Sequence, residues 1–171
     1  YTIPQTDPQK KGTSVYSFYI GQDKSLYIGV KSLGFGRYDL RDHSFVPYKE
    51  IDAFRHLPPE INTAYCFHED TRGDLWIGTR YEGVYWISKA TGEYVNYLFD
   101  TSNSPYIAKE VRTISEDPYG QIWIGTSEGL FKFVPTHNAG RFELFRYLPE
   151  QDNPYSLTGK IINCVYVASD S

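Results

Sequence analysis

The sequence predicts an all-β protein assembled from repeated four-stranded antiparallel units. Of the 171 residues, 17% are aromatic, and 14 Gly and 10 Pro divide the β-favouring segments into short pieces. No stretch shows a sustained apolar period of 3.6 residues, so helix is not expected as the main element. An internal repeat is the third and strongest observation.

The repeat is clearest in two copies that lie 47 residues apart. Residues 74–79 read Asp-Leu-Trp-Ile-Gly-Thr, and residues 121–126 read Gln-Ile-Trp-Ile-Gly-Thr. A weaker copy at 25–30 has Tyr27 in the Trp place, and a fourth begins at 161–166. A period of this length indicates a repeat architecture rather than one irregular domain.

Each copy reads as four short strands separated by turns. In the third copy the first turn is Asp-Pro-Tyr-Gly at 117–120, where Pro presets φ and Gly permits a positive φ. The strands expected there are 111–116, 121–126, 130–134 and 141–147. Four strands in a unit of about 40–50 residues are typical of a β-propeller blade.

We therefore expect a β-propeller fragment of about three and a half blades, all belonging to one partial domain. Closed propellers have roughly 4–8 blades, so a longer parent protein is expected. Open apolar blade faces would favour self-association, with neighbouring blades and domains of the parent protein as the other partners. The expected segments are 1–13 (end of a preceding blade and connector), 14–60 (blade 1), 61–109 (blade 2), 110–159 (blade 3) and 160–171 (first strand of a following blade).

Composition argues against several classes of protein. The formal net charge is −4 and no basic block stands out, so this segment is not expected to bind nucleic acid. Its apolar runs are too short for a membrane span. The four His residues lack metal-ligand spacing, and neither a metal nor another cofactor is expected. Cys66 and Cys164 occupy one blade position in two non-neighbouring blades, which predicts two free thiols.

Residues 114–126, followed by Gly129-Leu130, resemble the two-component regulator propeller repeat, and so do residues 69–84. The connector at 152–157 is similar to the usual link between such blades, and the resemblance extends from Val15 to Val165. It implies the periplasmic sensor region of a hybrid two-component regulator of the Bacteroidetes type. It further implies an oligosaccharide ligand and control of glycan-utilisation genes through histidine kinase and DNA-binding domains outside this chain.

Comparison of the copies separates framework from candidate site. Trp76 and Trp123 recur at one position, which indicates packing between blades. The Glu-Asp pairs at 69–70 and 116–117 also recur, and Asp at the start of a turn can accept hydrogen bonds from backbone N–H groups. We interpret these carboxylates as structural rather than catalytic.

Non-recurring polar residues on two kinds of loop predict a binding face. One kind joins strands two and three of a blade, and the other leads into the next blade. Arg80, Tyr81 and Glu82 form the best patch, because a planar cation, an aromatic platform and an acceptor together suit a sugar. Arg112 is a candidate for lining the central channel. The further candidates are Lys31, Tyr106, Lys109, Ser127 and Glu128 for ligand contact, with Arg55, His56 and Tyr155 on loops leading into the next blade.

Three functions remain open at this point. The first is a ligand-binding sensor without catalytic activity in this chain. The second is a propeller that docks proteins or supports neighbouring domains. The third is a glycan hydrolase or lyase, which would need a non-recurring pair of acid and base residues that the sequence does not show.

Overall fold

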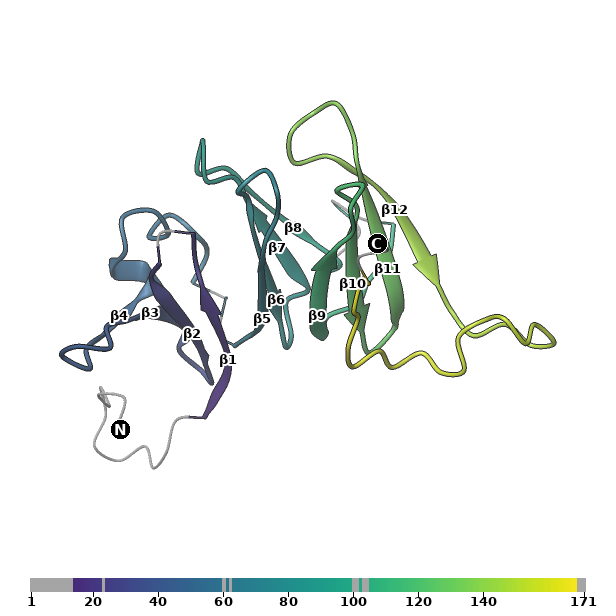
Figure 1. Cartoon of the computed structure of the whole chain (residues 1–171), viewed down its shortest axis with the longest axis horizontal. Helices are drawn as coiled ribbons and strands as arrows, with labels where there is room; N and C mark the ends of the chain where they lie inside the picture. Colours follow the sequence, from purple (N-terminus) through teal and green to yellow (C-terminus); the bar gives the residue numbers. More distant parts are fainter. Residues whose placement is uncertain are drawn as a thin grey trace.

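The computed structural model describes residues 14–22, 24–59, 61, 63–99, 102 and 105–168. The expected end of a preceding blade at 1–13 lies outside the described residues. Within the described residues the chain forms three separate four-stranded sheets, each antiparallel and each built from consecutive strands (Figure 1). The predicted all-β propeller fragment is confirmed.

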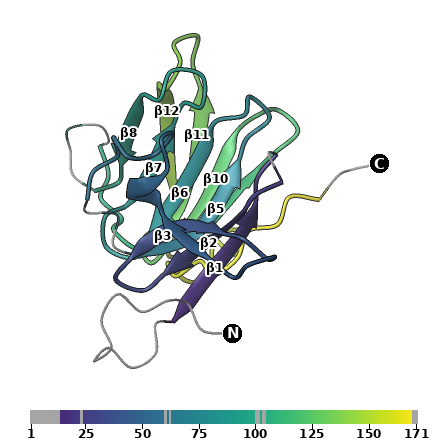
Figure 2. The ribbon, with the colours of Figure 1, turned by 90° about the vertical axis from the view of Figure 1, so that its left-hand side faces the viewer.

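The sheets follow one another in chain order. The first contains β1 (Val15–Ile20), β2 (Leu26–Val30), β3 (Gly34–Tyr38) and β4 (Phe45–Pro47). The second contains β5 (Ala64–Glu69), β6 (Leu75–Thr79), β7 (Val84–Ile87) and β8 (Tyr94–Tyr97). The third contains β9 (Val111–Glu116), β10 (Ile122–Thr126), β11 (Gly129–Pro135) and β12 (Phe142–Tyr147). One 3-10 turn, η1 (Tyr48–Glu50), follows β4. Figure 2 looks along the row of sheets with β1–β3 in front.

The first strand of each sheet lies beside the first strand of the next. Contacts join β1 to β5 and β5 to β9, so these strands form the inner edge of the row. Each sheet falls within one of the ranges 14–60, 61–109 and 110–159, and we refer to the sheets as blades 1, 2 and 3. This arrangement places the loops that follow each second strand at one common end of the molecule.

A turn aspartate connects the first two strands in blades 2 and 3. Asp70 Oδ1 accepts hydrogen bonds from the backbone N–H groups of Arg72 (3.0 Å) and Asp74 (2.9 Å). Its Oδ2 accepts one from Trp76 Nε1 at 2.9 Å. One buried carboxylate therefore shapes the turn and fixes the orientation of the indole ring, and charge-assisted bonds of this kind are among the stronger ones in proteins.

Blade 3 repeats the same three bonds with Asp117. Its Oδ1 accepts from the N–H groups of Tyr119 and Gln121, both at 3.0 Å, and its Oδ2 accepts from Trp123 Nε1 at 2.9 Å. The prediction that the recurring aspartates accept backbone hydrogen bonds is confirmed. The bond to the indole nitrogen was not foreseen, and it explains why Asp and Trp recur together at a spacing of six residues.

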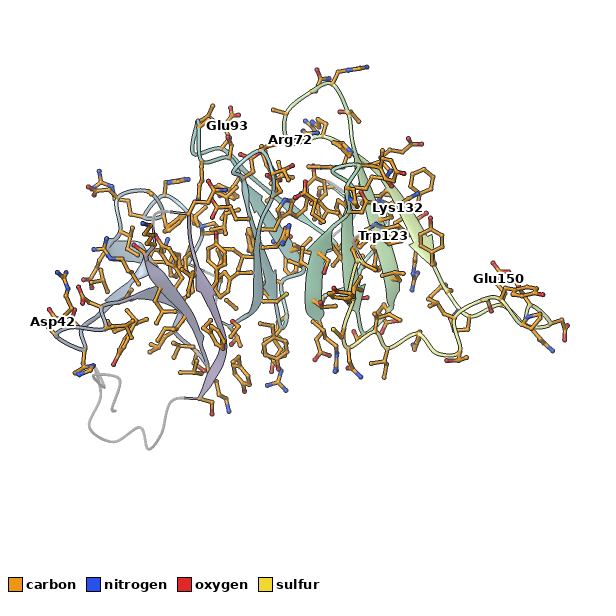
Figure 3. All side chains as sticks on the ribbon, in the orientation of Figure 1. Asp42, Arg72, Glu93, Trp123, Lys132 and Glu150 are labelled. Atoms are coloured by element: carbon orange, nitrogen blue, oxygen red, sulfur yellow. The ribbon has the colours of Figure 1, made fainter. Side chains whose placement is uncertain are left out.

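The tryptophan held in this way forms part of the contact between blades 2 and 3. Trp76 has no exposed surface, and its ring meets Phe133 and Phe142 of blade 3 edge-on, with centroids 5.6 and 5.0 Å apart. Edge-to-face aromatic pairs of this kind add stabilisation beyond the apolar area they bury. The predicted packing role of Trp76 is confirmed. In Figure 3, Trp123 and Lys132 are labelled on blade 3, where the Lys132 ammonium lies 5.5 Å from the Trp123 ring centroid.

The recurring glutamates connect each blade to the one before it. Glu116 Oε2 accepts a hydrogen bond from the backbone N–H of Thr71 (2.8 Å), and its Oε1 accepts from Thr71 Oγ1 (2.7 Å). Glu69 Oε2 accepts from the backbone N–H of Gln22 at 3.1 Å. These bridging glutamates satisfy donors of the neighbouring turn, so their carboxylates are structural, as the sequence predicts.

Glycine in the second strand allows the blades to approach closely. A Cβ on Gly78 would lie 2.5 Å from Cys66 Sγ and 2.6 Å from Val111 Cγ1. A Cβ on Gly125 would lie 2.6 Å from Thr113 Cγ2 and 2.7 Å from Ile162 Cγ2. The recurring Gly in the Trp-Ile-Gly-Thr sequence is therefore required by the segment that packs against it, which is β9 for Gly78 and residues 161–168 for Gly125.

The expected strand at 161–166 differs from the prediction. Residues 161–168 have no regular secondary structure, but they run along β9. Val165 O accepts a hydrogen bond from Ser115 Oγ at 2.9 Å, and the N–H of Ile162 donates to Thr126 O at 2.9 Å. Among the described residues, no strand pairs with this segment through a backbone ladder, so it lies in the position of a first strand without forming one.

Both cysteines are free, as predicted, but their surroundings differ. Cys66 lies between blades 2 and 3, where its Sγ contacts Val111 O, whereas Cys164 is exposed. Burial raises the pKa of the Cys66 thiol to about 12. The thiolate is the reactive form, so Cys66 stays protonated and unreactive near neutral pH.

We expect Asp70→Ala to destabilise the protein by about 2–4 kcal/mol, because it leaves the buried Trp76 N–H and two backbone N–H groups without their acceptor. Urea unfolding followed by fluorescence measures this loss. Asp42→Ala is the control, because Asp42 is exposed in the β3–β4 turn of blade 1 and accepts a hydrogen bond from the Ser44 N–H there. Equal losses in the two variants would contradict the role given to the turn aspartate.

We expect Gly78→Ala to lower the free energy of unfolding by about 1–3 kcal/mol through overpacking against blade 3. Gly159→Ala is the matched control, because a Cβ at Gly159 would have no heavy atom within 4 Å among the neighbours considered. Thermal unfolding of both variants tests the idea. An unchanged midpoint for Gly78→Ala would show that the blades do not meet at this glycine.

Thiol titration at pH 8 checks the cysteine assignment. One thiol per chain, Cys164, should react rapidly with a disulfide reagent in the native protein, and both should react in denaturant. Cys164→Ser should abolish the rapid reaction. Rapid reaction of two native thiols, or of none, would contradict the described burial.

Candidate ligand-binding site

The loops between second and third strands form one continuous face with the segments leading into the next blade. Backbone hydrogen bonds connect Arg80 N–H to Thr63 O (3.1 Å) and Gly83 N–H to Lys109 O (2.9 Å). A further bond connects Ser127 N–H to Glu110 O at 3.2 Å. Loops of blades 2 and 3 are therefore fixed relative to each other by main-chain atoms, which suits a surface that must hold side chains in place.

This face lies at the end of the blades opposite the outer turns. Arg72 and Glu93, labelled at the top of Figure 3, belong to the β5–β6 and β7–β8 turns of blade 2. Because β6 and β7 run antiparallel, the loop that joins them lies at the other end of the sheet. We call this end, with the loops at 31–33, 80–83, 105–110 and 127–128, the loop face.

Arg80 lies between two tyrosine rings on the loop face. Its guanidinium carbon is 5.1 Å from the ring centroid of Tyr81 and 5.8 Å from that of Tyr65. Among the described residues no carboxylate forms an ion pair with Arg80. Tyr81 is 53% exposed. The positive charge is thus positioned by aromatic faces, and its N–H groups are not committed to an acidic side chain.

Glu82 differs from the expected exposed acceptor. It is only 9% exposed, and its backbone N–H donates to Thr79 Oγ1 at 2.8 Å. Its neighbour Gly83 has a φ of 69°, in the left-handed region that favours glycine. The accessible patch therefore consists of the half-buried Arg80 and the exposed Tyr81, whereas Glu82 is buried.

Four of the predicted residues share one hollow on the loop face. This hollow of about 570 Å³ is open to solvent. Its lining includes the four predicted residues Tyr106, Lys109, Ser127 and Glu128, together with Pro105, Ile107, Glu110 and Arg146. Arg146 donates from Nε to Glu128 O at 3.0 Å, and Lys160 pairs with the Glu128 carboxylate at 3.3 Å. The lining of the hollow therefore contains two cations, two carboxylates and the half-buried ring of Tyr106.

Arg112 lies beside this hollow on β9. Its Nη2 donates to Glu110 Oε1 at 3.0 Å, and its Nη1 donates to Asn163 Oδ1 at 2.7 Å. The guanidinium therefore connects the segment leading into blade 3 with residues 161–168. Its Nε has no hydrogen-bond partner within the described residues. On blade 1, Lys31 is exposed at the β2–β3 loop of the same face.

Two expected positions do not reach the loop face. His56 Nε2 lies 2.5 Å from Gly92 O in the β7–β8 turn, so the segment containing Arg55 and His56 is at the opposite end of blade 2. The prediction for that segment was wrong, because the connector folds back over the outer turn. Tyr155 is 96% exposed on the loop after β12, which projects away from the blades near the labelled Glu150 (Figure 3).

Tyr16 and Tyr65 are further residues at the loop face that the sequence pattern does not single out. Their ring centroids lie 4.9 Å apart at an interplanar angle of 56°. The Arg80 guanidinium carbon lies 5.8 Å from the centroid of the Tyr65 ring. Burial raises the pKa of Tyr65, and the Arg80 charge acts in the opposite direction. The sequence contains 16 Tyr. Only the equivalent positions of Tyr16 and Tyr65 in two blades distinguish them from the other tyrosines.

Neither a metal-binding cluster nor a membrane-spanning helix is found within the described residues. No group of three or more His, Cys, Asp or Glu side chains there could hold a metal ion. In the same residues, no helix has the length and apolar character needed to cross a membrane.

Residues 59–81 and 105–128 match the family described as two-component regulator propeller. These segments contain the two copies in which turn aspartate, tryptophan and glycine recur. These two segments are therefore similar to two-component regulator propeller repeats. No curated protein gives a significant match.

Solved structures similar to the chain have the same architecture. The extracellular domain of a putative hybrid two-component system from B. thetaiotaomicron aligns with a TM-score of 0.62 and 25% identity, over 94% of this chain and 18% of that one. The extracellular domain of a putative one-component system from the same organism gives 0.66 and 23%, over 88% and 18%. The repeats described here thus span 18% of the length of these two domains.

A propeller enzyme shares the fold alone. The virginiamycin B lyase of Staphylococcus aureus aligns with a TM-score of 0.55 and 16% identity, over 84% of this chain and 44% of the lyase. An identity this low supports the blade architecture and carries no inference about activity.

Proposed function

We propose that the chain is a ligand-sensing segment in the periplasmic region of a hybrid two-component regulator, and that its ligand is an oligosaccharide. In this proposal, binding controls glycan-utilisation genes through histidine kinase and DNA-binding domains outside the chain. The repeats and the similarity to extracellular domains of two-component systems support the sensor part. The oligosaccharide part rests on the loop face.

The observation that carries this proposal is Arg80 held between Tyr65 and Tyr81 on loops that main-chain hydrogen bonds fix. A sugar presents C–H faces to aromatic rings and hydroxyl groups to planar donors. Because the framework is already formed, binding would order few additional groups, which favours affinity.

Binding without turnover is the expected outcome in this chain. The recurring carboxylates Glu69, Asp70, Glu116 and Asp117 are committed to turns and blade contacts. Their bonds to backbone N–H groups and indole nitrogens serve the framework rather than a reacting bond. A propeller that only docks proteins is the alternative, and it predicts no effect of soluble oligosaccharides.

Calorimetric titration of the full-length periplasmic region against plant and host oligosaccharides tests the proposal. We expect saturable binding of one glycan class without new reducing ends. Arg80→Ala combined with Tyr81→Ala should weaken binding at least about tenfold.

The control combines Arg72→Ala with Tyr119→Ala, which removes the same residue types from outer turns at the opposite end. It should leave the affinity unchanged. Absence of binding across the panel would contradict oligosaccharide sensing and favour the docking alternative. Release of reducing ends would contradict the non-catalytic assignment.

A further inference from the structure

The three first strands carry a β-bulge at the same place. The pairing register shifts between Val15 and Ser17 in β1, and between Ala64 and Cys66 in β5. In β9 the same shift lies between Val111 and Thr113. The extra residue in each strand is thus Tyr16, Tyr65 or Arg112. A bulge redirects one side chain and is frequent beside functional sites.

The repeated bulge presents different side chains in each blade. Most recurring positions keep their chemistry from blade to blade because they maintain the framework. Here the backbone irregularity recurs, while the side chain changes from tyrosine to arginine. Asn163 occupies the corresponding place in residues 161–168, since Ile162 meets Gly125 as Val111 meets Gly78. We call Tyr16, Tyr65, Arg112 and Asn163 the bulge row.

Members of the bulge row contact one another in pairs. The Tyr16 and Tyr65 rings lie 4.9 Å apart, and Arg112 donates to Asn163 at 2.7 Å. Because β1, β5 and β9 are adjacent, the row crosses the blades at the loop face. Tyr65 meets Arg80, while Arg112 meets Glu110 on the wall of the hollow. The bulge row and the hollow therefore form one surface. The rings of Tyr16 and Tyr65 lie at one side of it, and Arg112 lies beside the hollow.

Several cations of this surface have no acidic partner. Among the described residues of the loop face and the bulge row, the cations are Lys31, Arg80, Lys109 and Arg112, and the carboxylates are Glu82, Glu110 and Glu128. Glu82 is buried, and Glu110 pairs with Arg112. Arg80 and Lys109 form no ion pair within the described residues, so both are available to an anionic ligand.

We propose that the bulge row and Arg80 bind an anionic saccharide, with a sugar ring on Tyr16 and Tyr65 and an acidic group on Arg80. This inference rests on the proposed oligosaccharide function and specifies its ligand class. A guanidinium fork matches the paired oxygens of a carboxylate or a sulfate. Arg80 suits this role because it has no acidic partner among the described residues.

The test is calorimetric titration of the full-length periplasmic region with three probes of similar length. These are galacturonic acid oligosaccharides, the same oligosaccharides as neutral methyl esters, and sulfated oligosaccharides. At least one anionic probe should bind about tenfold or more tightly than the methyl esters, and its affinity should fall as salt rises. The two anionic arms distinguish carboxylate from sulfate.

Substitutions of Arg80 and Tyr65 test which residues bind the anionic group and the sugar ring. Arg80→Gln should reduce affinity for the anionic probe about 10–100-fold and affect the methyl esters little. Arg80→Lys keeps the charge but loses the fork, and should give an intermediate loss. Tyr65→Leu should weaken both kinds of probe. Arg72→Gln, at the opposite end, is the control, and thermal unfolding verifies that each variant folds.

The outcomes separate this inference from the proposed function. Equal affinity for acid and ester, tighter binding of the ester, or an unchanged affinity in Arg80→Gln would overturn the anionic site while leaving saccharide sensing intact. If no saccharide of any charge bound, both proposals would fall.

Discussion

The hydrogen bond from a tryptophan indole to a turn aspartate is the interaction on which this structure depends. Asp70 closes the β5–β6 turn with two backbone bonds and uses its second oxygen to orient Trp76. That ring then forms the surface against which Phe133 and Phe142 of the next blade pack. A local turn is in this way coupled directly to the contact between blades, since the same side chain serves both.

Blade 1 shows what happens where this interaction is missing. Gly21 stands in the Asp place and Tyr27 in the Trp place, so both partners are replaced together. The turn keeps its backbone bonds, with Gly21 N–H donating to Ser25 O and Lys24 N–H donating to Gly21 O. An aromatic cluster replaces the indole contact, because Tyr27 packs on Tyr19 and meets Phe54 edge-on. The joint replacement indicates that the Asp and Trp residues of a blade depend on each other through their hydrogen bond.

The repeat made the blade architecture and the packing role of Trp76 predictable, because a residue type that recurs at one register position is tied to the framework. Long-range partners were not predictable in the same way. The hydrogen bond from the Thr71 N–H to Glu116 depends on how two sheets pack against each other, which a strand pattern does not define. The burial of Glu82 and the contact between His56 and Gly92 O also depend on how segments pack in space, which a strand pattern does not define.

The candidate site was only partly predictable for a related reason. Loop positions indicated Arg80 and the residues of the hollow, because polar side chains that do not recur are unnecessary for the framework. Tyr16 and Tyr65 were not distinguishable because a bulge is defined by the pairing of two strands, which the sequence alone does not give. The structure thus separates a constant frame, fixed by Asp, Trp and Gly, from one recurring backbone irregularity whose side chains vary.

A double-mutant cycle on Asp70 and Trp76 tests the central claim most directly. Trp76→Phe removes the indole N–H while keeping an aromatic ring, and Asp70→Ala removes its acceptor. Unfolding free energies of both single variants and the double variant give the coupling between them. We predict a coupling of about 1.5–3 kcal/mol, as expected for a hydrogen bond to a charged group. Additive losses, with a coupling near zero, would contradict the claim that this bond links each turn to the packing of its blade.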